Sequence, residues 1–263
     1  MRSTAILEVQ KLVVDYRQRV GWRFWKSRSI RAVNDVSLTL KRGEVLGIVG
    51  ESGSGKSTLI KAIGHFVPAT SGKIISDGKE VQALNDRQFF PYRRRLQIIP
   101  QNFSDALDPT MSVEAILREP LKIHFRLTAK ETALRIGALL ESVELDSSLL
   151  HRYPVQLSGG QRQRISIARG LAVSPEVLIC DEMTSACDVL VQKRILSLLD
   201  NLRHKHNMAI LWIAHNIAVV AHFCDTMIVM RHGRFLELGE PQAICQNPVH
   251  PYTRLLVDAV PHI

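Results

Sequence analysis

The sequence is poor in cysteine, and the few cysteines it has lack the spacing of a metal site. Its four cysteines, Cys180, Cys187, Cys224 and Cys245, form no Cys-x-x-Cys pair and no zinc-like pattern. Cys180 lies in an apolar run, where a free cysteine behaves as a small core residue. These features favour a reducing, cytosolic setting.

Segments that enter or cross a membrane are also missing. Residues 1–20 carry charge throughout and contain no apolar signal core. The longest apolar runs, such as residues 209–214, are far shorter than the ~20 residues that a membrane-spanning helix requires. We therefore expect a soluble protein that serves a membrane process, if any, from the side.

What the chain does have is length and positive charge. Its 263 residues suffice for one large or two small domains with a sizeable core. The formal net charge of +9 suits nucleic acid, an anionic membrane surface or phosphate groups, and does not choose among them.

The most informative stretch is a glycine-rich loop between an apolar strand, residues 45–49, and a helical segment, residues 59–63. Its first eight residues follow the pattern Gly-x-x-x-x-Gly-Lys-Ser, and a threonine comes next: Gly50, Glu51, Ser52, Gly53, Ser54, Gly55, Lys56, Ser57 and Thr58. The glycines let main-chain amides turn toward one anion, and the helix N-terminus adds partial positive charge. Lys56 is expected to reach the β- and γ-phosphates, and the Ser57 hydroxyl to bind Mg²⁺. The alternative, a flexible turn before an ordinary helix, does not explain the whole pattern, so we predict a nucleoside triphosphate site.

Alternation of strands and helices predicts an α/β fold. Several expected strands are wholly apolar, which is typical of a mostly parallel sheet covered on both faces. An Asp77-Gly78 pair predicts a hairpin within residues 74–81. The other expected strands are residues 6–15, 30–40, 96–99, 177–180 and 209–213.

Residues 102–170 read as a helical insertion within this frame. Thr128 and Glu131 have the spacing of a capping box. The helix that follows is predicted to bury one face made of Ala133, Ile136, Leu140 and Val143.

Two basic stretches have open interpretations. Residues 16–28 interleave arginines and lysine with aromatic side chains, which suits base stacking or a lipid surface, but also a solvated hairpin with local aromatic packing. The run Arg93-Arg94-Arg95 either contacts phosphate or is the solvated start of a strand.

A pair of carboxylates ends the apolar strand at residues 177–180. Asp181 is a candidate Mg²⁺ ligand, and Glu182 is a candidate for polarising the attacking water. Strands often end in acidic turns, so the phosphate loop is what favours the catalytic interpretation.

The segment Leu157-Ser158-Gly159-Gly160-Gln161 leads into another helix, with Ser158 as an expected N-cap. A plain capped helix is the simpler interpretation, but this pentapeptide is the signature of ATP-binding cassette (ABC) ATPases. Over nearly its whole length the chain resembles the nucleotide-binding subunit of an ABC transporter. The resemblance implies a P-loop NTPase cassette over residues 1–240, with an antiparallel β subdomain, the helical subdomain inserted at about 102–170, and ATP and Mg²⁺ as ligands.

The resemblance also assigns roles to single residues. It implies that Gln101 contacts Mg²⁺ and water, that His215 is the switch histidine near the γ-phosphate, and that Tyr16 stacks on adenine. Asp188 belongs to the loop that crosses the dimer. In such a head-to-tail dimer the signature, Ser158 to Gln161, acts on nucleotide held by the other subunit.

Three positions depart from the pattern of this family: Met183 replaces the usual proline, Cys187 a leucine and Asn216 an aspartate. None is expected to bind phosphate or metal directly. They bear on loop stiffness and subunit communication more than on hydrolysis.

The tail, residues 241–263, carries the string His250-Pro251-Tyr252-Thr253 and is similar to the helical extension of the peptide and nickel importers. This branch implies a second, different ATPase subunit, two transmembrane permeases and an extracytoplasmic binding protein, with this chain on the cytoplasmic face of the bacterial inner membrane. Peptide, nickel or a metallophore all remain open as cargo.

A soluble ABC-type ATPase acting on nucleic acid is the alternative that the positive charge suggests. Relatives of that kind carry long heptad insertions or two cassettes, and this chain has neither, so no nucleic acid partner is expected.

Overall fold

The computed structural model describes residues 5–19, 27–102, 106–183 and 188–259. Contacts divide the chain into two compact units. The first unit combines Met1–Phe90 with Ala209–Ile263, and the inserted unit is Pro91–Met208.

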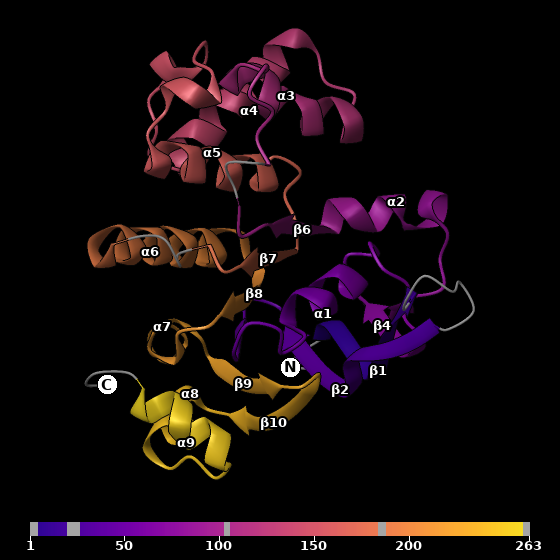
Figure 1. Cartoon of the computed structure of the whole chain (residues 1–263). Helices are drawn as coiled ribbons and strands as arrows, with labels where there is room; N and C mark the ends of the chain where they lie inside the picture. Colours follow the sequence, from indigo (N-terminus) through magenta and orange to yellow (C-terminus); the bar gives the residue numbers. More distant parts are fainter. Residues whose placement is uncertain (1–4, 20–26, 103–105, 184–187, 260–263) are drawn as a thin grey trace. The chain divides into compact units, whose positions relative to one another are not determined.

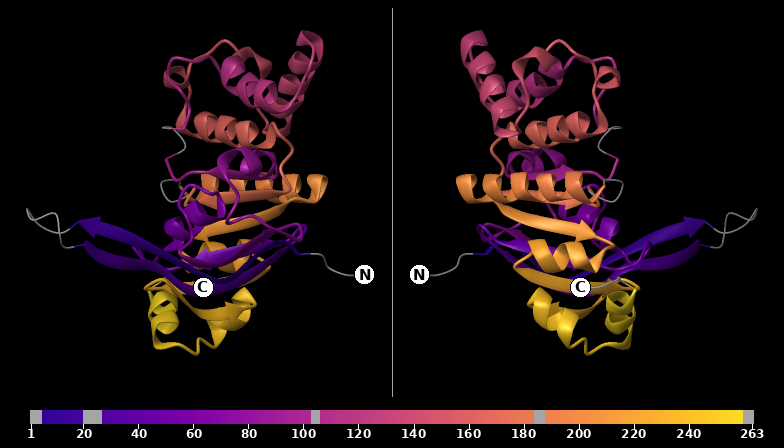
Figure 2. Two further views of the ribbon diagram at one scale, coloured as in Figure 1. Left: turned by 90° about the vertical axis from the view of Figure 1, so that its right-hand side faces the viewer. Right: turned by 90° about the vertical axis from the view of Figure 1, so that its left-hand side faces the viewer.

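An antiparallel sheet of four strands in the order β2-β1-β4-β5 forms one part of the first unit. Its strands are β1 (Ala5–Arg19), β2 (Ser27–Lys41), β4 (Ser71–Ser76) and β5 (Lys79–Glu80). Figures 1 and 2 show β1 and β2 running side by side as a long twisted ribbon. Asp77 and Gly78, both with positive φ, join β4 to β5, which confirms the predicted hairpin.

Parallel strands form the core of the first unit. β3 (Val45–Val49) lies between β8 (Ala209–Ala214) and β9 (Thr226–Arg231) and pairs in parallel with both, while β10 (Arg234–Gly239) pairs antiparallel with β9. Every residue of β3 and β8 is buried, as expected for strands covered on both faces.

Helices cover these strands. α1 (Lys56–Ile63) buries Leu59 and Ile63, and α7 (Ile217–Phe223) packs on β3 at Gly47, where a Cβ atom would come within 2.3 Å of Val220. After β10 the chain forms α8 (Pro241–Gln246) and α9 (Pro251–Asp258), which pack against α7.

The inserted unit holds another parallel pair, β6 (Leu96–Ile99) with β7 (Val177–Asp181). Its helices are α3 (Val113–His124), α4 (Ala129–Ser142), α5 (Gly159–Leu171) and α6 (Val189–His206), with short 3₁₀ turns at Ser147–Leu149 and Pro154–Gln156. α2 (Asp86–Arg95) spans the boundary between the units.

The predicted capping box begins α4: Thr128 Oγ1 accepts the Glu131 amide, and the Glu131 carboxylate accepts the Thr128 amide at 2.7 Å. Ile136, Leu140 and Val143 are buried as predicted. The prediction for Ala133 is wrong, since it is exposed, because the buried part of α4 begins only at Ile136 and continues through Leu139.

The arginine run at the end of α2 is not simply solvated. Arg95 forms an ion pair with Glu176 at 2.5 Å, and the Arg94 guanidinium lies 4.3 Å from the centre of the Phe125 ring, which Arg135 also stacks on at 4.2 Å. These contacts give Arg94 and Arg95 a structural role within the inserted unit.

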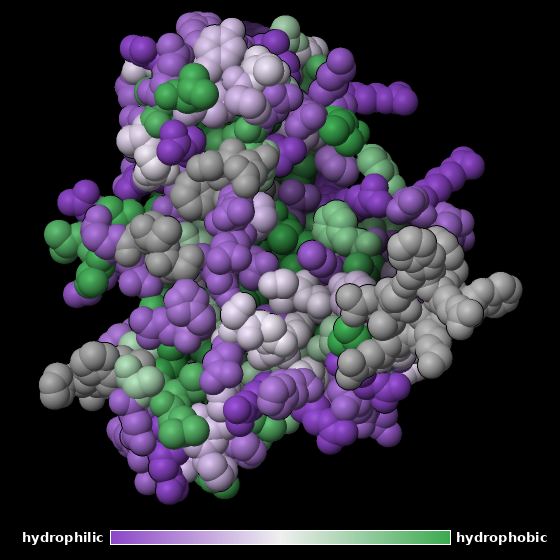
Figure 3. All heavy atoms as spheres, in the orientation of Figure 1, coloured by the Kyte–Doolittle hydropathy of each residue, from purple (hydrophilic) through white to green (hydrophobic). Residues whose placement is uncertain are grey.

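On the face shown in Figure 3, hydrophobic side chains lie in small patches among hydrophilic ones. Among the described residues, every helix is too short or too polar to span a bilayer.

Candidate functional site

The glycine-rich loop joins β3 to α1, as the sequence predicts, and two of its glycines admit no other residue. At Gly50 a Cβ atom would lie 2.1 Å from the Met230 carbonyl oxygen. Gly55 is the N-cap of α1 with φ of 107°, and a Cβ there would lie 2.3 Å from the Ala32 carbonyl oxygen. The loop main chain is therefore pressed against β2 and the end of β9, which leaves little freedom in its shape.

Lys56 extends into the loop. The residue is buried, with 4% exposed, and its ammonium donates to the carbonyl oxygens of Gly50 at 2.6 Å and Glu51 at 2.9 Å. A cation held by main-chain oxygens at the centre of an amide-lined loop is placed to meet an anion bound there.

Neighbouring segments hold the loop at its middle and its start. The Gly233 amide, in the β9–β10 turn, donates to Ser54 O at 2.8 Å, and Gly233 O accepts the Asn34 amide of β2 at 2.8 Å. The Glu51 amide donates to the Tyr252 hydroxyl of α9 at 2.9 Å. Sequence patterns do not predict Gly233 or Tyr252 as partners of the loop, although the pair His232-Gly233 is typical of a turn at the first of these positions.

Three other predicted residues of the first unit, Ser57, His215 and Tyr16, are exposed. Ser57 lies on the first turn of α1, and His215 directly follows β8. β8 pairs with β3 so that Ala214 lies opposite Val49, hence His215 and the loop emerge at the same edge of the sheet. Tyr16, on β1 opposite Ile30, is 38% exposed.

Gln101 and Glu182 meet in the inserted unit. β6 and β7 are parallel with Ile99 opposite Cys180, so the residues that follow them share one edge. Gln101 Nε2 donates to Glu182 Oε2 at 2.9 Å, and Asp181 is the last residue of β7. Burial raises the pKa of the adjacent Cys180 thiol, which suits a core residue rather than a nucleophile.

Two of the departures from the family pattern have defined surroundings. Met183 is buried, and its carbonyl oxygen accepts from Gln163 Nε2 of α5 at 2.9 Å, which holds a peptide that lacks the usual proline. Asn216 is the N-cap of α7, and its Oδ1 accepts the Ala218 amide at 2.9 Å. Cys187 lies outside the described residues.

The signature segment begins α5 with a capping box. Ser158 Oγ accepts the Gln161 amide at 3.2 Å, and Gln161 Oε1 accepts the Ser158 amide at 2.9 Å. Neither Gly159 nor Gly160 is required by packing, because a Cβ on either would meet no atom within 4 Å. Asp188 is likewise an N-cap, on α6, where its Oδ1 accepts the Val191 amide at 2.9 Å.

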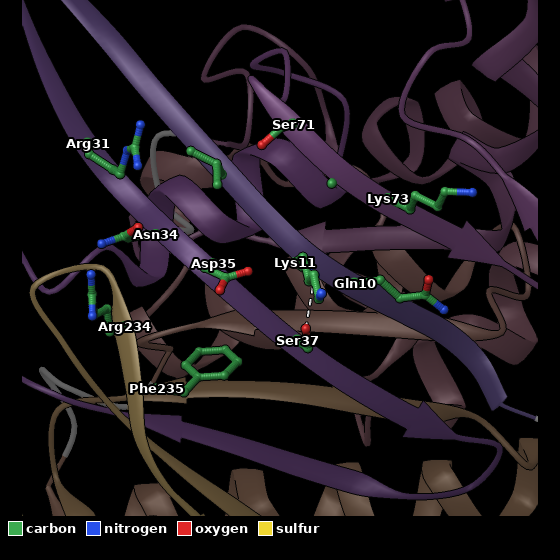
Figure 4. Close-up of a pocket in the computed structure, with 12 residues that line it drawn as sticks. Gln10, Lys11, Arg31, Asn34, Asp35, Ser37, Ser71, Lys73, Arg234 and Phe235 are labelled. Atoms are coloured by element: carbon green, nitrogen blue, oxygen red, sulfur yellow. Dashed lines mark hydrogen bonds between the residues drawn. The ribbon is translucent and has the colours of Figure 1, made fainter.

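A cavity of about 1040 Å³ lies in the first unit and is lined by residues of β1, β2, β4 and β10 (Figure 4). Among its cations, Arg31 pairs with Asp15 at 2.9 Å, Lys73 pairs with Glu80, and Arg234 donates to the Asn34 amide oxygen.

Comparison with known families gives two matches. A model described as "ABC transporter" matches residues 33–185, and one described as "Oligopeptide/dipeptide transporter, C-terminal region" matches residues 236–263.

Curated relatives agree with both matches. "Oligopeptide transport ATP-binding protein OppF" of Escherichia coli (strain K12) is 40% identical over 259 residues, which are 97% of this chain and 78% of the relative. The protein of the same description from Haemophilus influenzae is also 40% identical over 259 residues, again 97% of this chain and 78% of the relative.

Solved structures show the same fold. The structure of cbiO1 from Clostridium perfringens, part of the ABC transporter complex cbiONQ, superposes with a TM-score of 0.81 at 27% identity and covers 93% of this chain and 92% of that one. The dimeric ATP-binding cassette MJ0796, in a post-hydrolysis state with ADP and Pi, superposes with a TM-score of 0.79 at 28% identity. The superposition covers 89% of this chain and 98% of that one.

Proposed function

Since this chain belongs to the ABC transporter family, we propose that it is the ATP-hydrolysing subunit of a peptide importer. The choice of peptide as the cargo rests on the match of residues 236–263 to the C-terminal region of oligopeptide and dipeptide transporters. This match favours peptide over nickel or a metallophore, and transport over an action on nucleic acid. We assign residues 1–240 to the cassette and 241–263 to the importer-type extension.

The residues of the loop bind the triphosphate of ATP in this proposal. Main-chain amides of the loop other than that of Glu51, which donates to Tyr252, contact the phosphates, and the buried Lys56 ammonium exchanges its carbonyl partners for phosphate oxygens. Tyr16, half-exposed on β1, stacks on the adenine, and the exposed His215 contacts the γ-phosphate.

Ser57, Gln101 and Asp181 are the proposed Mg²⁺ ligands. A hydroxyl, an amide and a carboxylate offer the oxygen donors that Mg²⁺ takes, and one carboxylate is enough because substrate phosphates and water supply further ligands. Held by these residues, Mg²⁺ would supply positive charge that offsets the negative charge developing on the transferred phosphoryl group.

Glu182 is the proposed general base. Its carboxylate accepts a hydrogen bond from Gln101 at 2.9 Å, which orients it at the end of β7, and it accepts the proton of the attacking water.

The proposal extends to the assembly. A second, homologous but different ATPase subunit pairs with this chain, and Ser158, Gly159, Gly160 and Gln161 contact the nucleotide of that partner, with Asp188 at the dimer interface. Two transmembrane permeases and an extracytoplasmic binding protein complete the importer, and this chain lies on the cytoplasmic face of the inner membrane.

Glu182→Gln tests the proposal because it removes the base and leaves the phosphate loop intact. In the assembled transporter we expect ATP turnover to fall by roughly 10²–10⁴-fold while ATP still binds. Cells that carry this variant should lose uptake of a radiolabelled oligopeptide and keep uptake of radioactive nickel. Glu141→Gln, the same chemical change at an exposed position on α4, is the matched control. Turnover near the wild-type value in Glu182→Gln would remove Glu182 from its role, and loss of nickel uptake alone would contradict the choice of peptide.

A further inference from the structure

The string His250-Pro251-Tyr252-Thr253 builds the start of α9. His250 is the N-cap, and its Nδ1 accepts the Tyr252 amide at 3.1 Å, while its own amide donates to the Glu237 carboxylate of β10. Pro251 occupies the first helical position, where a missing amide costs nothing. These contacts fix the direction in which the next side chain leaves the helix.

The Tyr252 side chain is itself held in place both at its ring and at its hydroxyl. Only 1% of the residue is exposed, and the Arg231 guanidinium at the end of β9 lies 4.3 Å from the centre of its ring. Its hydroxyl accepts the Glu51 amide at 2.9 Å. Burial raises the pKa of this hydroxyl, which therefore stays a neutral phenol near neutral pH.

The bond to Glu51 acts on the peptide that holds the catalytic lysine. The Gly50–Glu51 peptide donates its N–H to Tyr252 and accepts Lys56 Nζ at its oxygen, at 2.6 Å. One planar unit is thus held from both sides, since a peptide cannot rotate its N–H without rotating its C=O. Another anchor of the loop, the bond from the Gly233 amide to Ser54 O, acts three residues further on.

From this arrangement we infer that Tyr252 is a positioning residue for ATP, through which the C-terminal extension sets the shape of the phosphate loop. The inference rests on the proposed function of the loop. Without the hydroxyl, the Gly50–Glu51 peptide is free to tilt, and Lys56 loses a fixed starting position. The cost falls on nucleotide binding, because the hydroxyl bonds to a main-chain amide of the loop that is proposed to hold the triphosphate.

Thr253 provides a matched control next to Tyr252. It is 0% exposed, and its hydroxyl has no hydrogen-bond partner within the part of the chain that the structure describes. Thr253→Val therefore removes a buried hydroxyl from the same turn of the same helix without removing a contact to the loop.

Equilibrium binding of ATP and steady-state hydrolysis by the full-length protein test the inference. We expect Tyr252→Phe to raise the Kd and KM for ATP by roughly 2- to 12-fold, the range that one net hydrogen bond gives, with kcat changed less than about two-fold. Thr253→Val should have the wild-type Kd, KM and kcat. A purely structural role for Tyr252 predicts a lower Tm with unchanged Kd and KM, and that result overturns the inference.

A double-mutant cycle with Lys56→Ala makes the test sharper. If Tyr252 acts through the peptide that holds Lys56, its effect on the Kd should largely vanish once the lysine is gone. Additive effects contradict the proposed route. Wild-type protein that fails to bind ATP would reject the proposed function itself, whereas wild-type binding with an unaltered Tyr252→Phe variant rejects only this inference.

Discussion

The glycines of the phosphate loop and those of the signature segment are present for different physical reasons. Gly50 and Gly55 are required by the fold, because a Cβ at either position would overlap a carbonyl oxygen at 2.1 or 2.3 Å. At Gly159 and Gly160 there is open space, and both have ordinary backbone conformations. The signature glycines therefore point to an external ligand that must approach the main chain closely.

Gly160→Ala separates stability from function at the residue scale. Alanine within the first turn of α5 should leave the free energy of unfolding unchanged or raise it by about 0.4–1 kcal/mol. ATP turnover in the assembled dimer should fall on the order of 10²-fold, since the added methyl displaces the partner's nucleotide. Urea unfolding and an ATPase assay measure the two effects, and a variant with wild-type turnover would contradict a role for this glycine at the nucleotide.

At the scale of single elements, most of the correct predictions rest on local sequence patterns. The strand, loop and helix around Lys56, the Asp77-Gly78 hairpin and the capping box of Thr128 and Glu131 all follow from interactions between residues close in sequence. The failures involve partners that local patterns do not contain. Ala133 has helical spacing but lies before the packed part of α4, and Arg95 pairs with Glu176, 81 positions away.

The capping box gives a prediction for α4. Thr128→Ala removes the acceptor for the Glu131 amide and should lower the free energy of unfolding by about 1 kcal/mol, without changing ATP affinity. Thr132→Ala, which removes a bond from the same helix to the Thr128 carbonyl, should cost under about 0.5 kcal/mol. Chemical denaturation of both variants measures the difference, and equal losses would mean that the cap contributes nothing specific.

At the scale of the whole molecule, the family resemblance predicted the fold class, and the comparisons confirm it. The hydrogen bond between Glu51 and Tyr252 could not be predicted from the sequence, because 201 positions separate the two residues and neither residue type indicates which partner it bonds to. The same holds for the Gly233 amide on the loop. Such contacts depend on how β9, β10 and α9 return to the loop in three dimensions. The roles of Gln101, Glu182 and the signature stay predictions until nucleotide is bound.

The central claim is that the loop from Gly50 to Thr58 binds ATP with Lys56 at its centre, and a nucleotide titration tests it most directly. Titrating wild-type protein and Lys56→Ala with a fluorescent ATP analogue and Mg²⁺ should give saturable binding to the wild type. The variant should bind at least roughly tenfold more weakly, because it loses a charge-assisted contact to phosphate. Equal affinity in the two proteins, or no binding by the wild type, would contradict the account.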